Sequence, residues 1–278
     1  MKTYLIFILA ACLAALPLVA RETADDEEDP YFLLAGEAAK DIEEGDYASA
    51  EKRIKEAIAM RPDDPGNVLL MSNLGLVYSY MGNDSLALAT FDDALRIAPS
   101  MKTVIVNRAR VLLKNGRDAE AYSDLSDVIA ADSANVEARY LHGLLSLGLA
   151  DLALADADMR VLADAEPESL RTAVGMSALL SAQGKHKEAT PYLKRMVEKS
   201  GEAEDYAALA ANLLELGKLS EAGETIAEGM KKYPSSGELY LCRARLNRDR
   251  YAYGDAKADA KRAEALGVER SRIRGLGL

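Results

Sequence analysis

Apolar residues recur at helical spacing along most of this 278-residue chain, and residues 73–99 show the pattern most clearly. There, apolar side chains repeat every three or four positions on both sides of a turn at Gly82, Asn83 and Asp84. The pattern residues are Leu74, Gly75, Tyr78, Ala87, Phe91, Ala94 and Pro99. Small residues let two helices approach, larger ones fill the seam between them, and proline ends the second helix. We therefore predict a helical hairpin.

The same pattern returns at nearly constant intervals. The alanine of Ala87 recurs at positions 121, 155, 189 and 222, with spacings of 34, 34, 34 and 33 residues. A turn-rich insertion at residues 63–67 makes the preceding step, from Ala50, three residues longer. We expect hairpins to start near residues 31, 68, 102, 136, 170, 203 and 237.

This pattern resembles the tetratricopeptide repeat, a helix-turn-helix unit of 34 residues. The resemblance covers residues 31–266 and implies an all-α, right-handed superhelix, or solenoid, of about seven hairpins. It also implies a role in binding other proteins. The seventh unit carries Tyr251 in place of the turn glycine and is rich in arginine, so we expect an end cap, followed by a basic tail at 267–278. Its residues 271–274 are interpreted as a short helical turn or a frayed end.

Pro191 lies a few residues into the second helix expected for the fifth hairpin. Its ring and its missing N–H disturb a helix that has already started. We therefore predict that this helix begins late, with Thr190 as N-cap, or is kinked at Pro191.

The N-terminal residues 1–20 have the features of a secretory signal peptide. Lys2 precedes an apolar run, and Ala20 offers a small residue before Arg21. We expect export to the periplasm or cell envelope of a bacterium, followed by an acidic, disordered leader at residues 21–30. Residues 9–12, LAAC, also resemble a bacterial lipobox, so a lipid anchor at Cys12 is the alternative to cleavage before Arg21.

Charge is unevenly distributed along the chain, whose net charge is −11. Residues 21–100 carry 18 acids against 7 bases, whereas residues 237–278 carry 10 bases against 6 acids. The acidic bulk argues against nucleic-acid binding, which requires a basic face. After removal of residues 1–20, Cys242 is the one remaining cysteine, so no internal disulfide can form.

Residues suited to catalysis or metal binding are scarce. The sequence has two histidines and lacks metalloprotease, phosphate-loop and nucleophile-elbow spacings. We therefore predict a protein that is not an enzyme, with no cofactor and no metal. His142 is interpreted as a packed imidazole, His186 as exposed and Cys242 as a half-buried packing residue beside two arginines. Core positions are expected for Met159, Met176 and Met196.

The family resemblance also implies a binding surface, because the first helices of such hairpins line a concave groove. Its register selects Asn73, Leu76, Tyr80, Asn107, Arg110, Lys114, Tyr140, Leu144 and Arg171. The apolar members are expected to remain exposed after the seams have packed. Together with the cations, they favour an extended or helical peptide that bears acids.

Three alternatives remain open at the sequence level. One tetratricopeptide subfamily clamps the carboxylate of chaperone tails, but here only Asn73 and Asn107 match, and the flanking basic positions hold other residues. The chain is otherwise a lipid-anchored outer-membrane assembly or accessory factor, or a scaffold that self-associates through its acidic and basic ends. A hydrolytic accessory role lacks a catalytic constellation.

Overall fold

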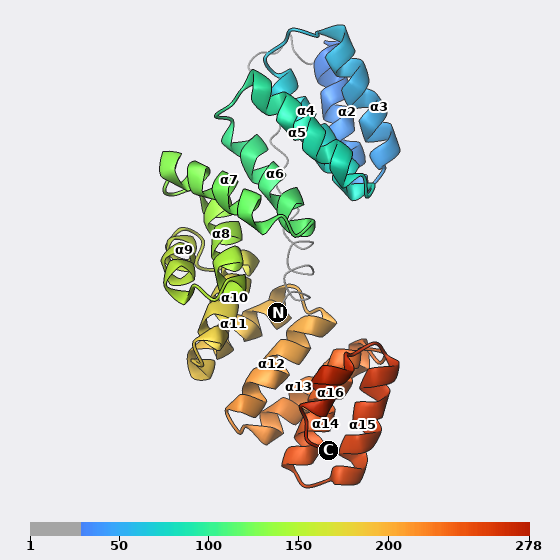
Figure 1. The fold of residues 1–278 in the computed structure, drawn as a ribbon. Helices are drawn as coiled ribbons and strands as arrows, with labels where there is room; N and C mark the ends of the chain where they lie inside the picture. The colour runs from blue at the N-terminus through green and yellow to red at the C-terminus, as the bar shows by residue number, and fades with distance from the viewer. Residues whose placement is uncertain (1–28) are drawn as a thin grey trace. The chain divides into compact units, whose positions relative to one another are not determined.

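The computed structural model describes residues 29–278, and every regular element in that range is a helix (Figure 1). The predicted signal, the lipobox cysteine and nearly all of the acidic leader lie outside the described residues. The chain divides into two compact units, the first ending at Gly148 and the second beginning at Leu149. The predicted all-α hairpin fold is confirmed within them.

The first unit holds three hairpins and one further helix. They are α2 (Pro30–Glu44), α3 (Tyr47–Met60), α4 (Asn67–Tyr80), α5 (Asp84–Ile97), α6 (Lys102–Lys114), α7 (Asp118–Ala131) and α8 (Val136–Gly148). The second unit holds α9 (Leu152–Ala165), α10 (Leu170–Ala182), α11 (His186–Lys199), α12 (Ala203–Glu215), α13 (Leu219–Lys232), α14 (Gly237–Asp249), α15 (Tyr253–Ala265) and α16 (Arg270–Arg274). First helices start at, or one residue before, the positions expected from the spacing.

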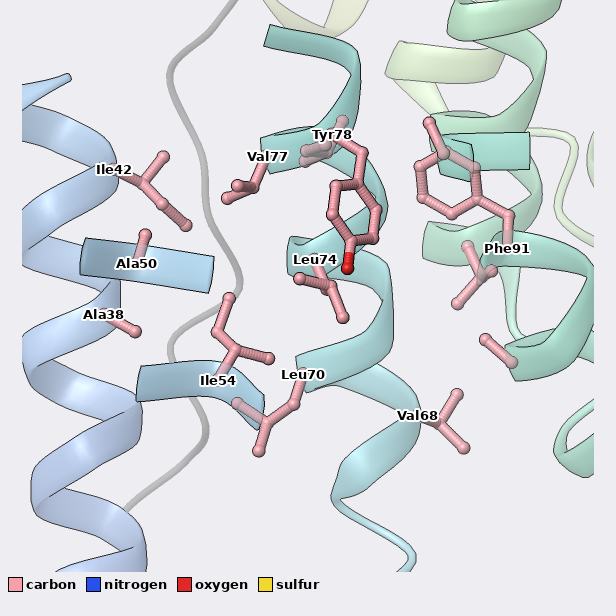
Figure 2. Packing of buried hydrophobic residues seen from close by; sticks show 14 of the residues in the cluster. Ala38, Ile42, Ala50, Ile54, Val68, Leu70, Leu74, Val77, Tyr78 and Phe91 are labelled. Atoms are coloured by element: carbon pink, nitrogen blue, oxygen red, sulfur yellow. The ribbon is translucent and has the colours of Figure 1, made fainter. Parts of the chain in front are cut away.

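The seam of the second hairpin is closed by one aromatic ring and one glycine. Phe91 of α5 is fully buried, and a Cβ atom at Gly75 of α4 would lie 2.5 Å from Cε1 of that ring. Ile54 and Leu70 pack in the same cluster, between the first and second hairpins (Figure 2). The residues assigned to the seam from the sequence are therefore in the core, and the glycine is there because any larger residue would collide with Phe91.

The second unit uses other pairs of large and small residues at the same task. Met159 of α9 is fully buried against Gly175 of α10, and a Cβ atom at Gly229 would lie 2.8 Å from the Cβ atom of Tyr206. Met196 is also buried, whereas Met176 is partly buried. These methionines are packing residues, as predicted.

The turns inside the hairpins require a left-handed backbone at one position. Gly82 has φ of 81°, a conformation that costs glycine nothing. Ala150 and Tyr251 hold that conformation without being glycine, each with φ of 62°. Tyr251 is 80% exposed, so the strained backbone of the last hairpin displays an aromatic ring to solvent.

The predicted late start of the helix that contains Pro191 is wrong. Helix α11 begins at His186 and includes Pro191 as its sixth residue. The hydroxyl of Thr190 donates to the backbone oxygen of His186, and the side-chain amide of Asn212 donates to the same oxygen at 3.0 Å. These side-chain hydrogen bonds hold the first turn, so the helix forms ahead of the proline instead of starting at it.

The C-terminal residues 267–278, expected to be a basic tail, include the short helix α16. Leu276 after this helix is buried in a cluster with Ala244 of α14 and Ala260 of α15. Arg248 donates a hydrogen bond to the backbone oxygen of Leu276, and Arg272 pairs with Glu238. The end of the chain therefore packs onto the last hairpin, and the helical turn, not the frayed end, is the correct interpretation.

Candidate peptide-binding surface

Helices α4 and α6 are the first helices of consecutive hairpins and lie in contact. The 34-residue spacing puts Asn73 and Asn107 at the same register position, and both are buried. Asn107 donates from Nδ2 to Oγ of Ser72 at 3.0 Å, so its amide links the two helices. The Asn73 side-chain oxygen is buried and has no hydrogen-bond partner within the described residues.

An aromatic pair lies at the end of α4. The ring of Tyr80 stacks on that of Tyr47 from α3, with centroids 5.0 Å apart and planes 28° apart. Burial raises the pKa of the Tyr80 phenol, and the positive charge of Arg110 opposes that rise. Tyr80 is half-buried and Leu76 is buried, so of these two predicted apolar contacts only Tyr80 presents much surface.

The predicted cations of the first unit already have internal partners. Arg110 forms an ion pair through Nη2 with Glu137 of α8, while its Nε atom is buried and lacks a hydrogen-bond acceptor in the described chain. Lys114 donates to the backbone oxygen of Ser79 at 2.9 Å and to Oδ1 of Asp84 at 2.8 Å. Lys114 thus ties the start of α5 to the end of α4, and Arg110 retains one unsatisfied donor.

The Lys114 contacts alter the acidity of their acceptor. Burial by itself raises the pKa of Asp84, but hydrogen bonds from Lys114, Ser79 and Asn115 outweigh it, so the pKa is lowered. This carboxylate stays ionised and holds Lys114 in place at neutral pH.

The expectation that packing leaves Tyr140 and Leu144 exposed is wrong. Tyr140 is 0% exposed and Leu144 is 2% exposed, because these residues of α8 are spent on the core. Arg171 belongs to the second unit, where it is half-buried and lies 3.8 Å from Glu166. The first unit therefore brings together Asn73, Leu76, Tyr80, Asn107, Arg110 and Lys114, of which Asn73, Tyr80 and Arg110 retain unused surface or polar capacity.

The remaining singled-out residues have packing roles. His142 is buried, with its ring centroid 4.8 Å from that of Tyr122, which confirms a packed imidazole. His186 is half-buried rather than exposed, and its Nδ1 atom lies 3.1 Å from Oδ1 of Asn212. Cys242 donates to the backbone oxygen of Ala207 at 3.4 Å, and burial raises its pKa to about 12. Such a thiol is unreactive at neutral pH.

Tyr47 is the contributor to this surface that sequence reasoning missed. It opens the second helix of the first hairpin, whereas the family register selects only first helices. Its position one repeat before the α4–α5 turn was the available signal. Among the described residues, no cluster of three or more potential metal-ligating side chains occurs, and none of their helices is both long and apolar enough to span a membrane.

Comparisons with known proteins agree on the family. The tetratricopeptide repeat profile matches residues 70–101. A tetratricopeptide repeat and J domain-containing co-chaperone, DNJ1 of Cryptococcus neoformans, is 32% identical over 107 residues, which are 38% of this chain and 20% of the relative. This chain therefore spans about one fifth of that protein's length.

Two solved structures share the fold along most of their own length. A tetratricopeptide repeat protein from Parabacteroides merdae superposes with a TM-score of 0.65 at 24% identity, covering 89% of this chain and 97% of that one. PilW, described as a type IV pilus biogenesis factor, gives a TM-score of 0.65 at 20% identity, covering 78% and 98%. At these identities the likeness concerns the fold.

Proposed function

Because this chain belongs to the tetratricopeptide repeat family, we propose that it is a non-enzymatic scaffold of the bacterial cell envelope that binds a peptide or protein partner along α4 and α6. Proteins of this family bind other proteins and are typically not enzymes. The finer elements of the proposal are the surface, the chemistry of the partner and the location.

The unpaired oxygen of Asn73 is the observation that carries the choice of surface. A buried acceptor without a partner is costly and uncommon in native proteins. Asn107, at the same register position one repeat later, satisfies its amide within the fold. Asn73 therefore has an acceptor to offer to a backbone N–H of an extended peptide, as main-chain recognition requires.

Tyr80 and Arg110 give this peptide its side-chain preferences. The stacked Tyr80 and Tyr47 rings supply rigid apolar area, a common feature of binding hot spots. Nε of Arg110 supplies one unused donor, suited to a carbonyl or carboxylate oxygen. A partner carboxylate at this point has to share the guanidinium with Glu137, so the proposal favours a peptide with one acid here and an apolar residue against the rings. Tyr140, Leu144, Asn107, Lys114 and Arg171 support this surface or lie outside it.

Support for an envelope location comes from two sources. The sequence of residues 1–20 has the features of a signal peptide, and PilW, a structural neighbour, is described as a pilus biogenesis factor. Cleavage before Arg21 would release the protein into the periplasm, whereas a lipidated Cys12 would make it the lipid-anchored alternative. N-terminal sequencing and mass spectrometry of the exported protein distinguish the two.

The partner test is crosslinking and pull-down from native envelope, followed by titration of the captured partner. Asn73→Ala should weaken binding about tenfold and leave the unfolding free energy unchanged or slightly higher, because it removes an unsatisfied acceptor. Asn107→Ala is the matched control, which should lower stability by about 1 kcal/mol through loss of the Ser72 bond. Unchanged binding by the Asn73 variant would show that the partner uses another surface.

A further inference from the structure

The last hairpin presents a surface that its own packing does not explain. Tyr251 holds the left-handed turn position where Gly82 stands in the second hairpin, and it does so with an exposed side chain. Burial therefore does not compensate the backbone strain. Tyr253, also 51% exposed, meets the Tyr251 ring edge-on, with centroids 6.4 Å apart. A strained residue kept at the surface is an indication of function.

Two lysines extend this aromatic pair along α15. Tyr253, Lys257 and Lys261 are spaced four residues apart, so they follow one side of the helix. Both lysines are exposed, and no carboxylate in the described residues forms an ion pair with either. We name Tyr251, Tyr253, Lys257 and Lys261 the Tyr–Lys surface.

Acids near this surface are already engaged or lie on another side. Glu264 pairs with Arg270, and Asp249 pairs with Arg248 at 2.7 Å. Asp255 is two positions from Tyr253, which places it about 200° around the helix. Arg243 and Arg245, the other cations of the hairpin, are bound to Asp259 and Glu215. The unneutralised charge is that of the two lysines.

The chain itself contains a segment of matching chemistry. Residues 22–29, ETADDEED, hold six acids and no base, and residues 25–29 form the longest run of acids in the sequence. We propose that the Tyr–Lys surface binds this acidic segment of a second copy of the chain. Carboxylates pair with the lysines and accept hydrogen bonds from the tyrosine hydroxyls, while the rings pack against the short side chains of Thr23 and Ala24.

This contact is head-to-tail, because it joins two different surfaces of identical chains. Assemblies are therefore expected to grow with protein concentration. The attraction is between exposed charges, so it should weaken strongly between about 0.05 and 0.5 M salt as the screening length falls.

The test is sedimentation velocity on residues 21–278 over a wide concentration range at low and high salt. We expect association at low salt, at least tenfold weaker in Lys257→Glu/Lys261→Glu and abolished by deletion of residues 21–28. The control is Lys187→Glu/Lys194→Glu, which makes the same charge change at exposed lysines of α11 and should associate normally. Tyr251→Gly should associate about fivefold more weakly while keeping the fold, because glycine prefers this turn position.

A synthetic peptide of residues 21–29 provides the second readout. It should bind the shortened chain and dissociate the full one. A chain that stays monomeric at every concentration overturns the proposal, as does association that survives either the lysine reversal or the deletion. Loss of association in the α11 control would also overturn it, because the effect would then follow net charge and not this surface.

Discussion

The second hairpin, α4 and α5, and the last hairpin, α14 and α15, share one register but close their seams differently. In the second, Gly75 faces the ring of Phe91, and these two residues fill the space between the helices. In the last, the corresponding residues are Ala244 and Ala260, which leave room, and Leu276 from beyond α16 enters it. An internal repeat completes its seam with its own residues, whereas the terminal repeat borrows one from the following segment.

The first way to break this comparison is to remove the ring. Phe91→Ala should lower the unfolding free energy of the first unit by about 3–5 kcal/mol, because the side chain is fully buried and Gly75 cannot fill the cavity. Denaturant unfolding monitored by circular dichroism measures this.

The counterpart in the last hairpin is Leu276→Ala. It should cost about 2–3 kcal/mol, a smaller loss because Leu276 lies near the chain end and is 8% exposed. An equal or larger loss than for Phe91→Ala would contradict the view that this leucine only completes a terminal seam.

The second prediction concerns the small partner in the seam. Gly75→Leu should destabilise by about 1–3 kcal/mol, since even its Cβ atom collides with the Phe91 ring. Gly254→Leu in α15 is the control, because nothing lies within 4 Å of a Cβ atom there. Its stability should be unchanged or raised. Matching melting curves for wild type and Gly75→Leu would mean that the register of α4 is wrong.

The fold was readable from the sequence because one pattern repeats, and each repeat checks the next. The interval from Ala87 to Ala222 placed the helices without any long-range information. The candidate surface was harder. Tyr140 and Leu144 occupy groove positions in the family register, yet they are buried, since the register gives a side chain's direction and not what covers it. Glu137 and Asp84, which neutralise Arg110 and Lys114, come from neighbouring helices and depend on tertiary packing.

A third prediction tests the turn in which the two hairpins differ. Tyr251→Gly should raise the stability of the second unit by about 1 kcal/mol, because it relieves a left-handed backbone at a residue with little burial to lose. The reverse change in the second hairpin, Gly82→Tyr, should cost a similar amount. Thermal unfolding of both variants measures the pair, and a destabilised Tyr251→Gly protein would show that the aromatic contact with Tyr253 outweighs the strain.

The smallest expected effect concerns Cys242, which holds in the last hairpin the register position of Asn73 in the second. Asn73 keeps an unpaired acceptor, whereas Cys242 is buried and donates to Ala207. Burial raises the thiol pKa from 9.0 to about 12, so the neutral thiol keeps its full contribution to stability below pH 9 and loses it as the pH rises towards 12. At pH 8, alkylation in the chain without residues 1–20 should be at least about a hundredfold slower than in denaturant. Cys242→Ala should flatten the loss of stability between pH 9 and 12. Rapid alkylation of the folded protein would show that α14 opens to solvent and that the terminal hairpin, unlike the second, is not held closed by its seam.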